Sequence, residues 1–161
     1  MRFAFHPITE AEARAVCGWR YPPPYAVYNA SISSVPSLLD PANHYFAAVD
    51  EPDELVGFAC FGPDARVPGE LAQEDADEGF LDVGLGLRPD LTGRGLGLAF
   101  VEAILAHGRA TFAPRGFRLA VLTFNHRAIA VYERAGFRPA RVIRGPSPDG
   151  VREFLVMRRD A

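Results

Sequence analysis

The chain has 161 residues, of which 48% are hydrophobic and 23% charged, and its formal net charge is −3. This length and composition predict one globular domain over residues 1–161, and the slightly acidic balance argues against a nucleic-acid partner. No apolar run approaches the ~20 residues of a membrane span, and the first residues lack a signal-peptide pattern, so we expect no membrane contact and a cytoplasmic location.

The first sixty residues are predicted to contain a helix and three strands. Phe3–Phe5 is typical of a short strand, and Thr9 is placed to cap a helix that begins at the next residue. The sequence YPPPY at Tyr21–Tyr25 excludes a helix interior, because proline removes an N–H donor and clashes with the preceding turn. His44–Val49 and Leu55–Phe61 are predicted to be two strands joined by an acidic turn.

Strands and helices alternate in the second half of the chain. The predicted elements are a strand at Phe80–Leu87, a helix from Gly95 to about Phe112, a strand at Phe117–Thr123, a helix at His126–Ala135 and a final strand pair at Val142–Ile143 and Glu153–Met157. Gly136 follows the second helix, where glycine commonly ends helices. This pattern predicts an α/β (α+β) fold with one central mixed, mostly antiparallel sheet flanked by helices.

Three glycines alternate with other residues between the Phe80–Leu87 strand and the helix that follows it: Gly93, Gly95 and Gly97. Glycine has no Cβ and lets a ligand approach the backbone, and the first N–H groups of a helix lack internal partners and lie at the positive end of the helix dipole. A glycine-rich turn into a helix is therefore a natural phosphate site. The alternative is a tight turn with close packing of the helix on the sheet.

Residue counts narrow the kind of phosphate ligand. The sequence has no lysine, which excludes Schiff-base chemistry and a lysine-dependent phosphate loop, and the glycine spacing does not fit the dinucleotide-binding fingerprint. Arg88 and Arg94 flank the turn and can pair with phosphate oxygens. Two cysteines, Cys17 and Cys60, are too few for a disulfide framework or a zinc site, so we expect no metal. These observations indicate a phosphorylated cofactor.

Two segments carry a resemblance to a known family. VGLGLRPDLTGRGLGLAFVEAIL resembles the acetyl-CoA-binding segment of the GCN5-related N-acetyltransferase (GNAT) superfamily, whose Gln/Arg-x-x-Gly-x-Gly/Ala motif aligns with Thr92–Gly97, with Thr92 in place of the usual Gln or Arg. LAVLTFNHRAIAVYERAGFRP resembles a second family segment through Asn125, Tyr132 and Gly136-Phe137. The resemblance covers roughly Leu55–Met157. Through WRYPPPYAVYN, the chain's beginning loosely resembles the ribosomal-protein N-terminal acetyltransferase group.

This resemblance implies an enzyme that transfers an acetyl group from acetyl-CoA to a primary amine by direct attack in a ternary complex. The strands Phe80–Leu87 and Phe117–Thr123 would be neighbouring parallel strands that splay apart to admit the pantetheine arm. The implied cofactor-binding residues are Leu85, Gly86 and Leu87 for the pantetheine or thioester, Gly93, Arg94, Gly95, Leu96, Gly97 and Leu98 for the pyrophosphate, and Asn125.

Catalytic roles are implied for two side chains. Tyr132 has the family's general-acid position and would protonate the leaving thiolate; the alternative is a core aromatic residue. Asp82 is the candidate acceptor of the amine proton; the alternatives are an exposed or helix-capping carboxylate, with ordered water as the acceptor. The glutamate base of some family members is absent, since Ala120 has its position. Asn125 is equally suited to be a plain N-cap.

Other functions and partners stay open at this point. A non-catalytic acyl-CoA-binding or sensing module would keep the same cofactor site, and a phosphate-binding scaffold would have no thioester role. The expected acceptor is a small-molecule or peptide amine of unspecified identity, and a homodimer is left open. The aromatic segment Trp19–Tyr28 is either a lid over the acceptor or a packing cluster, and the acidic segment Glu70–Glu78 either attracts a cationic amine or is a solvated loop.

Overall fold

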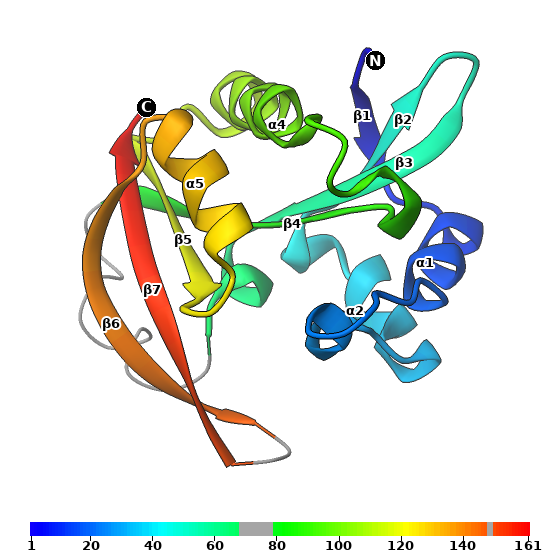
Figure 1. Ribbon diagram of the computed structural model, residues 1–161. Coiled ribbons are helices and arrows are strands. Elements are labelled where there is room, and N and C mark those ends of the chain that lie inside the picture. The colour runs from blue at the N-terminus through cyan, green and yellow to red at the C-terminus, as the bar shows by residue number, and fades with distance from the viewer. Residues whose placement is uncertain (68–78, 148–149) are drawn as a thin grey trace. The chain divides into compact units, whose positions relative to one another are not determined.

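Seven strands form a mixed sheet, and their hydrogen-bonded order in the computed structural model is β1-β2-β3-β4-β5-β7-β6 (Figure 1). The structure describes residues 1–67, 79–147 and 150–161. The strands are β1 (Ala4–Pro7), β2 (Tyr45–Asp50), β3 (Glu54–Phe61), β4 (Phe80–Leu87), β5 (Gly116–Leu122), β6 (Arg138–Ser147) and β7 (Gly150–Asp160). β4 and β5 are a parallel pair, whereas β1–β2, β2–β3, β5–β7 and β6–β7 are antiparallel. The predicted mixed, mostly antiparallel sheet is confirmed.

Contacts between Cα atoms divide the chain into two compact units. The first unit is Met1–Cys60 with Leu85–Leu96, and the second is Phe61–Gly84 with Gly97–Ala161. The single domain expected for residues 1–161 stays a prediction. The acidic segment Glu70–Glu78 lies outside the described residues, so the two roles considered for it stay predictions.

The first unit contains α1 (Glu10–Cys17) and α2 (Val35–Leu39) beside β1–β3. The predicted cap of α1 is confirmed as a capping box, in which the Thr9 hydroxyl accepts from the Glu12 N–H and the Glu12 carboxylate accepts from the Thr9 N–H. The short helix α2 was not predicted. The core of this unit joins one face of the sheet to both helices through Ile8, Ala13, Val16, Cys17, Val35, Leu38 and Ala47.

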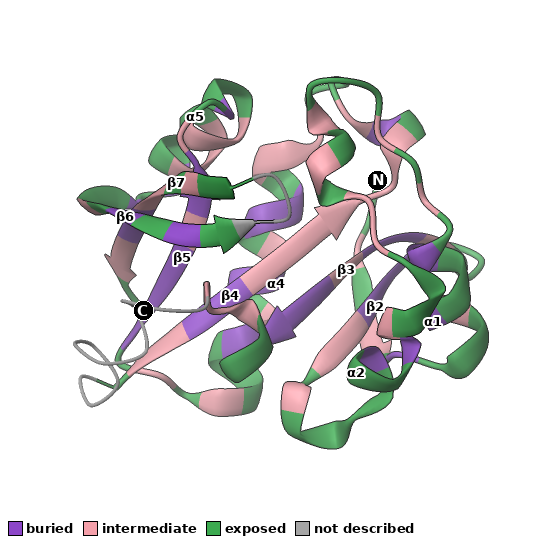
Figure 2. Cartoon of the chain, turned by 90° about the horizontal axis from the view of Figure 1, so that it is seen from below, coloured by how far each residue is buried: buried purple, intermediate pink, exposed green. Residues whose placement is uncertain are grey.

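The second unit contains the longer helices α4 (Gly97–Phe112) and α5 (His126–Arg134), which pack against each other. Gly108 of α4 lies on the sheet, where a Cβ would come within 2.9 Å of the Phe61 and Phe117 rings. Buried residues run along β3 and β5 (Figure 2). Across residues 1–67, 79–147 and 150–161, every helix falls short of the length and apolar character that a membrane span requires.

The register between β4 and β5 is short. It pairs Phe80 with Gly116 and ends with Asp82 opposite Arg118, although β4 continues to Gly84 within the second unit. β5 continues to Leu122, where it pairs with β7. The parallel ladder therefore ends before either strand does.

Candidate cofactor-binding and catalytic site

The end of β4 in the first unit is held by aromatic side chains. A Cβ on Gly86 would overlap the Phe58 ring, so a glycine is needed there for β3 and β4 to keep this contact. Trp19 packs on the same ring, with 6.3 Å between centroids. The Tyr21 hydroxyl donates to the Leu87 carbonyl at 2.6 Å, and the Tyr21 N–H donates to the Asn29 side chain at 2.7 Å. Trp19 and Tyr21 thus attach part of the aromatic segment to the predicted pantetheine residues.

Burial of the Tyr21 phenol shifts its pKa. It raises the pKa of Tyr21 from 10.0 to about 12. The folded state therefore favours the neutral phenol, and this contribution to stability is present below about pH 10 and is lost as the pH rises through 12. We expect the free energy of unfolding of Tyr21→Phe to fall less than that of the parent between pH 10 and about 12, because the variant has no phenol to ionise. Urea unfolding at several pH values measures this difference. An unchanged pH dependence in the variant would contradict the assignment.

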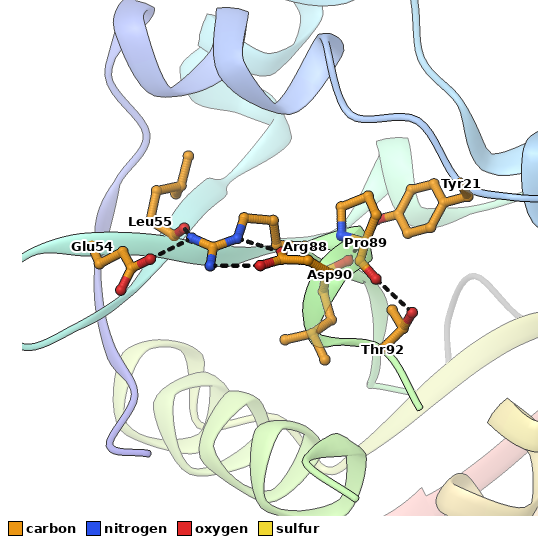
Figure 3. Close-up of polar contacts among 8 residues, drawn as sticks. Tyr21, Glu54, Leu55, Arg88, Pro89, Asp90 and Thr92 are labelled. Atoms are coloured by element: carbon orange, nitrogen blue, oxygen red, sulfur yellow. Dashed lines mark hydrogen bonds and ion pairs between the residues drawn. The ribbon is translucent and has the colours of Figure 1, made fainter. Parts of the chain in front are cut away.

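The turn after β4 combines a tight 3₁₀ turn with two glycines of unusual backbone geometry. The Thr92 hydroxyl donates to the Pro89 carbonyl at 2.7 Å (Figure 3). Gly93 and Gly95 follow with φ of +72° and +78°, in the left-handed region that favours glycine. A Cβ on Gly95 would meet no atom within 4 Å. The side of Gly95 on which a side chain would lie is therefore open, which leaves room for a ligand to approach the backbone. The positive φ of Gly95 also explains why α4 begins two residues later than predicted.

Gly97 has a different role from the other two glycines. It begins α4, and a Cβ on it would come within 3.1 Å of the Val131 side chain on α5. The glycine thus allows the first turn of α4 to approach α5 closely, so this close packing is between two helices and not between a helix and the sheet. Leu98 follows it, and the amides of this first turn have no acceptor within the helix.

The helix α5 carries Asn125 and Tyr132 at defined positions. Asn125 is buried and caps the helix, since its side-chain oxygen accepts from the Ala128 N–H at 3.2 Å. At the other end, the Phe137 N–H donates to the Tyr132 carbonyl and the Gly136 N–H to the Glu133 carbonyl, both at 3.0 Å. This pair of bonds is a Schellman motif, and Gly136 has the positive φ of +92° that it needs.

Tyr132 is half-buried, and its ring takes part in the same helix end. The Tyr132 and Phe137 rings meet edge to face with 6.1 Å between centroids, which is the apolar contact that usually accompanies a Schellman motif. The Tyr-to-Gly-Phe spacing thus has a structural reason of its own. The general-acid role of Tyr132 concerns only its hydroxyl and stays a prediction.

Asp82 is bound by two arginines in the second unit. Arg118 donates to both carboxylate oxygens, at 2.7 and 2.9 Å, and Arg66 Nε donates to Oδ2 at 2.6 Å. The side chains of Asp82 and Arg118 are only 5% and 1% exposed. Arginine donors thus occupy both oxygens of a buried carboxylate, which is the arrangement of a structural ion pair. The geometry therefore favours a structural role for Asp82, and the catalytic role stays a prediction that this contact weakens.

The predicted site residues fall in both units. The first unit holds Leu85, Gly86, Leu87, Gly93, Arg94, Gly95 and Leu96, and the second holds Asp82, Gly97, Leu98, Asn125 and Tyr132. Arg94 is exposed, whereas Arg88 is bound by protein groups. Within the described residues, no group of three His, Cys, Asp or Glu side chains is arranged to hold a metal ion.

Sequence reasoning missed the partners of Tyr21, Arg88 and Asp82. One local signal was available, because Arg-Pro-Asp places Arg88 and Asp90 in a single turn that proline favours. The contacts of Tyr21 with Leu87 and of Arg88 with Glu54 join residues 66 and 34 positions apart, and no local pattern reports them.

The chain belongs to the acetyltransferase (GNAT) family, whose family model matches residues 6–137. Its fold is shared by a spermidine N-acetyltransferase SpeG chimera from Vibrio cholerae and hSSAT, with 15% identity, a TM-score of 0.73 and coverage of 99% of this chain and 96% of that one. The fold is also shared by an acetyltransferase of the GNAT family from Bacillus anthracis, with 13% identity, a TM-score of 0.73 and coverage of 99% of this chain and 95% of that one. A third similar structure is the aminoglycoside acetyltransferase AAC(6')-Ib in complex with coenzyme A, with 22% identity, a TM-score of 0.70 and coverage of 96% of this chain and 94% of that one. None of the curated proteins compared matches this chain.

Proposed function

We propose that the protein is an N-acetyltransferase that transfers the acetyl group of acetyl-CoA to a primary amine by direct attack in a ternary complex. The observation that carries this proposal is the open space beside Gly95, in a turn that runs directly into the first turn of α4. Membership of the acetyltransferase family supports it, as does a fold shared with an acetyltransferase that binds coenzyme A. The activated thioester supplies the acetyl group.

The chain's own residues then have separate tasks. The backbone amides of Gly93–Leu98 would bind the pyrophosphate, because the first amides of α4 have no acceptor within the helix and lie at the positive end of its dipole. The backbone of Leu85–Leu87 would bind the pantetheine arm as an added strand does. Asn125 would contact the cofactor in addition to capping α5. The Tyr132 hydroxyl would give its proton to the leaving thiolate, and we assign acceptance of the amine proton to ordered water because Asp82 is held by Arg118 and Arg66.

The acceptor class is proposed as a primary amine. Two structural neighbours act on amines, spermidine in one case and aminoglycosides in the other. The test is release of free thiol from acetyl-CoA in the presence of a polyamine, an aminoglycoside, free amino acids and peptides with a free N-terminus. Thiol release that depends on one of these amines supports the transferase. Coenzyme A binding without any amine-dependent release would support the sensing module instead.

Gly95→Asn should weaken coenzyme A binding strongly while leaving the fold intact. Asparagine tolerates the left-handed region, so backbone strain stays small, but its side chain fills the space that the phosphate would occupy. Titration calorimetry measures the loss. Gly150→Asn is the matched control, because Gly150 also has a positive φ and open space around it, in the β6–β7 hairpin. Equal affinities in parent, Gly95→Asn and Gly150→Asn would show that Gly95 serves only the turn.

A further inference from the structure

Arg88 lies between β4 and the glycine turn, and protein groups hold its guanidinium on two sides (Figure 3). Nε and Nη2 donate to the two carboxylate oxygens of Asp90 at 2.6 and 3.1 Å. Nη1 donates to a Glu54 carboxylate oxygen and to the Leu55 carbonyl, both at 2.8 Å. These contacts use four of the five N–H groups that a guanidinium has. A phosphate would have to compete with two carboxylates for them.

The contacts of Arg88 join three parts of the first unit. Glu54 begins β3, Arg88 directly follows β4, and Asp90 lies in the 3₁₀ turn Pro89–Leu91. The backbone is held as well, because the Arg88 N–H donates to the Val56 carbonyl at 2.8 Å and the Arg88 carbonyl accepts from the Leu91 N–H at 2.9 Å. The point at which the chain leaves the sheet is therefore fixed through both backbone and side chain.

The contacts continue as far as Thr92, whose hydroxyl closes the turn on Pro89. Directly after it come Gly93 and Gly95 with positive φ and, at Gly95, open space. The turn thus has a rigid first part and a second part shaped by glycine. A site whose backbone is ordered before binding has less conformational entropy to lose when the ligand binds.

We propose that Arg88 is a positioning residue that preorganises the Gly93–Leu96 part of the turn, in the first unit, for the cofactor pyrophosphate, and that it is not a phosphate ligand. This inference rests on the proposed function and corrects the expectation that Arg88 pairs with phosphate. Its fork geometry is the essential property, because the bidentate contact with Asp90 and the bond to Glu54 require a planar guanidinium.

Removing Asp90 distinguishes a positioning residue from a phosphate ligand, because the two roles predict opposite changes in coenzyme A affinity. Asp90→Ala frees half of the Arg88 contacts and adds positive charge beside the turn. If Arg88 is a positioning residue, coenzyme A affinity in calorimetry falls about tenfold, or about 1.4 kcal/mol, because the turn is no longer held. If Arg88 is a phosphate ligand, the released guanidinium and the lost negative charge tighten binding.

Arg88→Lys keeps the positive charge but replaces the planar guanidinium with a single ammonium group. We expect it to weaken coenzyme A binding at least as much as Asp90→Ala does, because it also disturbs the bonds to Glu54 and Leu55. The double variant should be no weaker than Arg88→Lys, since both changes remove the Arg88–Asp90 contact. In steady-state assays the KM for acetyl-CoA should rise while kcat at saturating cofactor stays at the parent value. A general loss of structure would lower kcat as well.

Glu10→Ala is the matched control, because Glu10 also forms an ion pair with an arginine, Arg14 at 2.8 Å, on the surface of the first unit. It should leave affinity unchanged. The Asp90 side chain is 58% exposed, and Asp90→Asn replaces the alanine variant if that fails to fold. Unchanged or tighter binding in the Asp90 variants overturns the inference and leaves the proposed function standing. A parent protein that does not bind coenzyme A overturns both.

Discussion

Tyr132→Phe is expected to reduce turnover by about 10²–10⁴-fold, the typical loss when a positioned general acid is removed. The substitution deletes only the hydroxyl. The Tyr132 carbonyl still accepts from the Phe137 N–H, and the phenylalanine ring keeps the edge-to-face contact with Phe137. Coenzyme A affinity and melting temperature should therefore remain near the parent values, while single-turnover assays with a verified acceptor show the loss.

Tyr132→Ala separates chemistry from packing at the same position. It removes the ring as well as the hydroxyl, so it should lower the melting temperature, which Tyr132→Phe does not. Tyr45→Phe, at a half-buried tyrosine of β2, controls for loss of a tyrosine hydroxyl as such. Parent turnover in Tyr132→Phe would make the tyrosine a packing residue of the α5 end and assign the proton donor elsewhere.

Asp82→Ala is expected to lower the free energy of unfolding by about 3–5 kcal/mol, as breaking a buried ion pair does. The reason is that the buried Arg118 guanidinium makes two hydrogen bonds to this carboxylate, and Arg66 makes a third. Urea unfolding measures the change. Glu10→Ala, which removes an exposed ion pair, should change stability by less than about 1 kcal/mol.

A catalytic role of Asp82 gives a different pattern. Asp82→Asn keeps the shape of the side chain, and a folded Asp82→Asn protein with lost activity at low pH and parent stability would make Asp82 the base. We expect the reverse, a destabilised variant whose pH–rate profile has the parent shape.

The sequence predicted those features whose signals are local. The Thr9 cap, the bounds of Phe80–Leu87 and the Asn125 cap each depend on residues within one turn or one strand, and all three agree with the structure. The strand pair β6–β7 extends further than predicted, because charged residues such as Arg144 and Arg152 continue the ladder.

Long-range contacts could not be predicted in the same way. The three alternating glycines look equivalent in the sequence, yet Gly95 faces open space while Gly97 faces Val131. This difference depends on where α5 packs. The partner of Asp82 is a second case, because its contact with Arg118 follows from the β4–β5 register, which a single strand does not reveal.

The Schellman motif at the end of α5 limits how this sequence can drift during evolution. Because the helix can end at Arg134 only if Gly136 keeps its positive φ, a larger residue there would alter the stretch that carries the Tyr132 carbonyl and ring. Gly136 would then be under the same purifying selection as the hydroxyl it helps to hold, without touching any substrate. A lineage that replaces Tyr132 would keep the constraint on Gly136, because the helix end depends on the backbone and not on the hydroxyl.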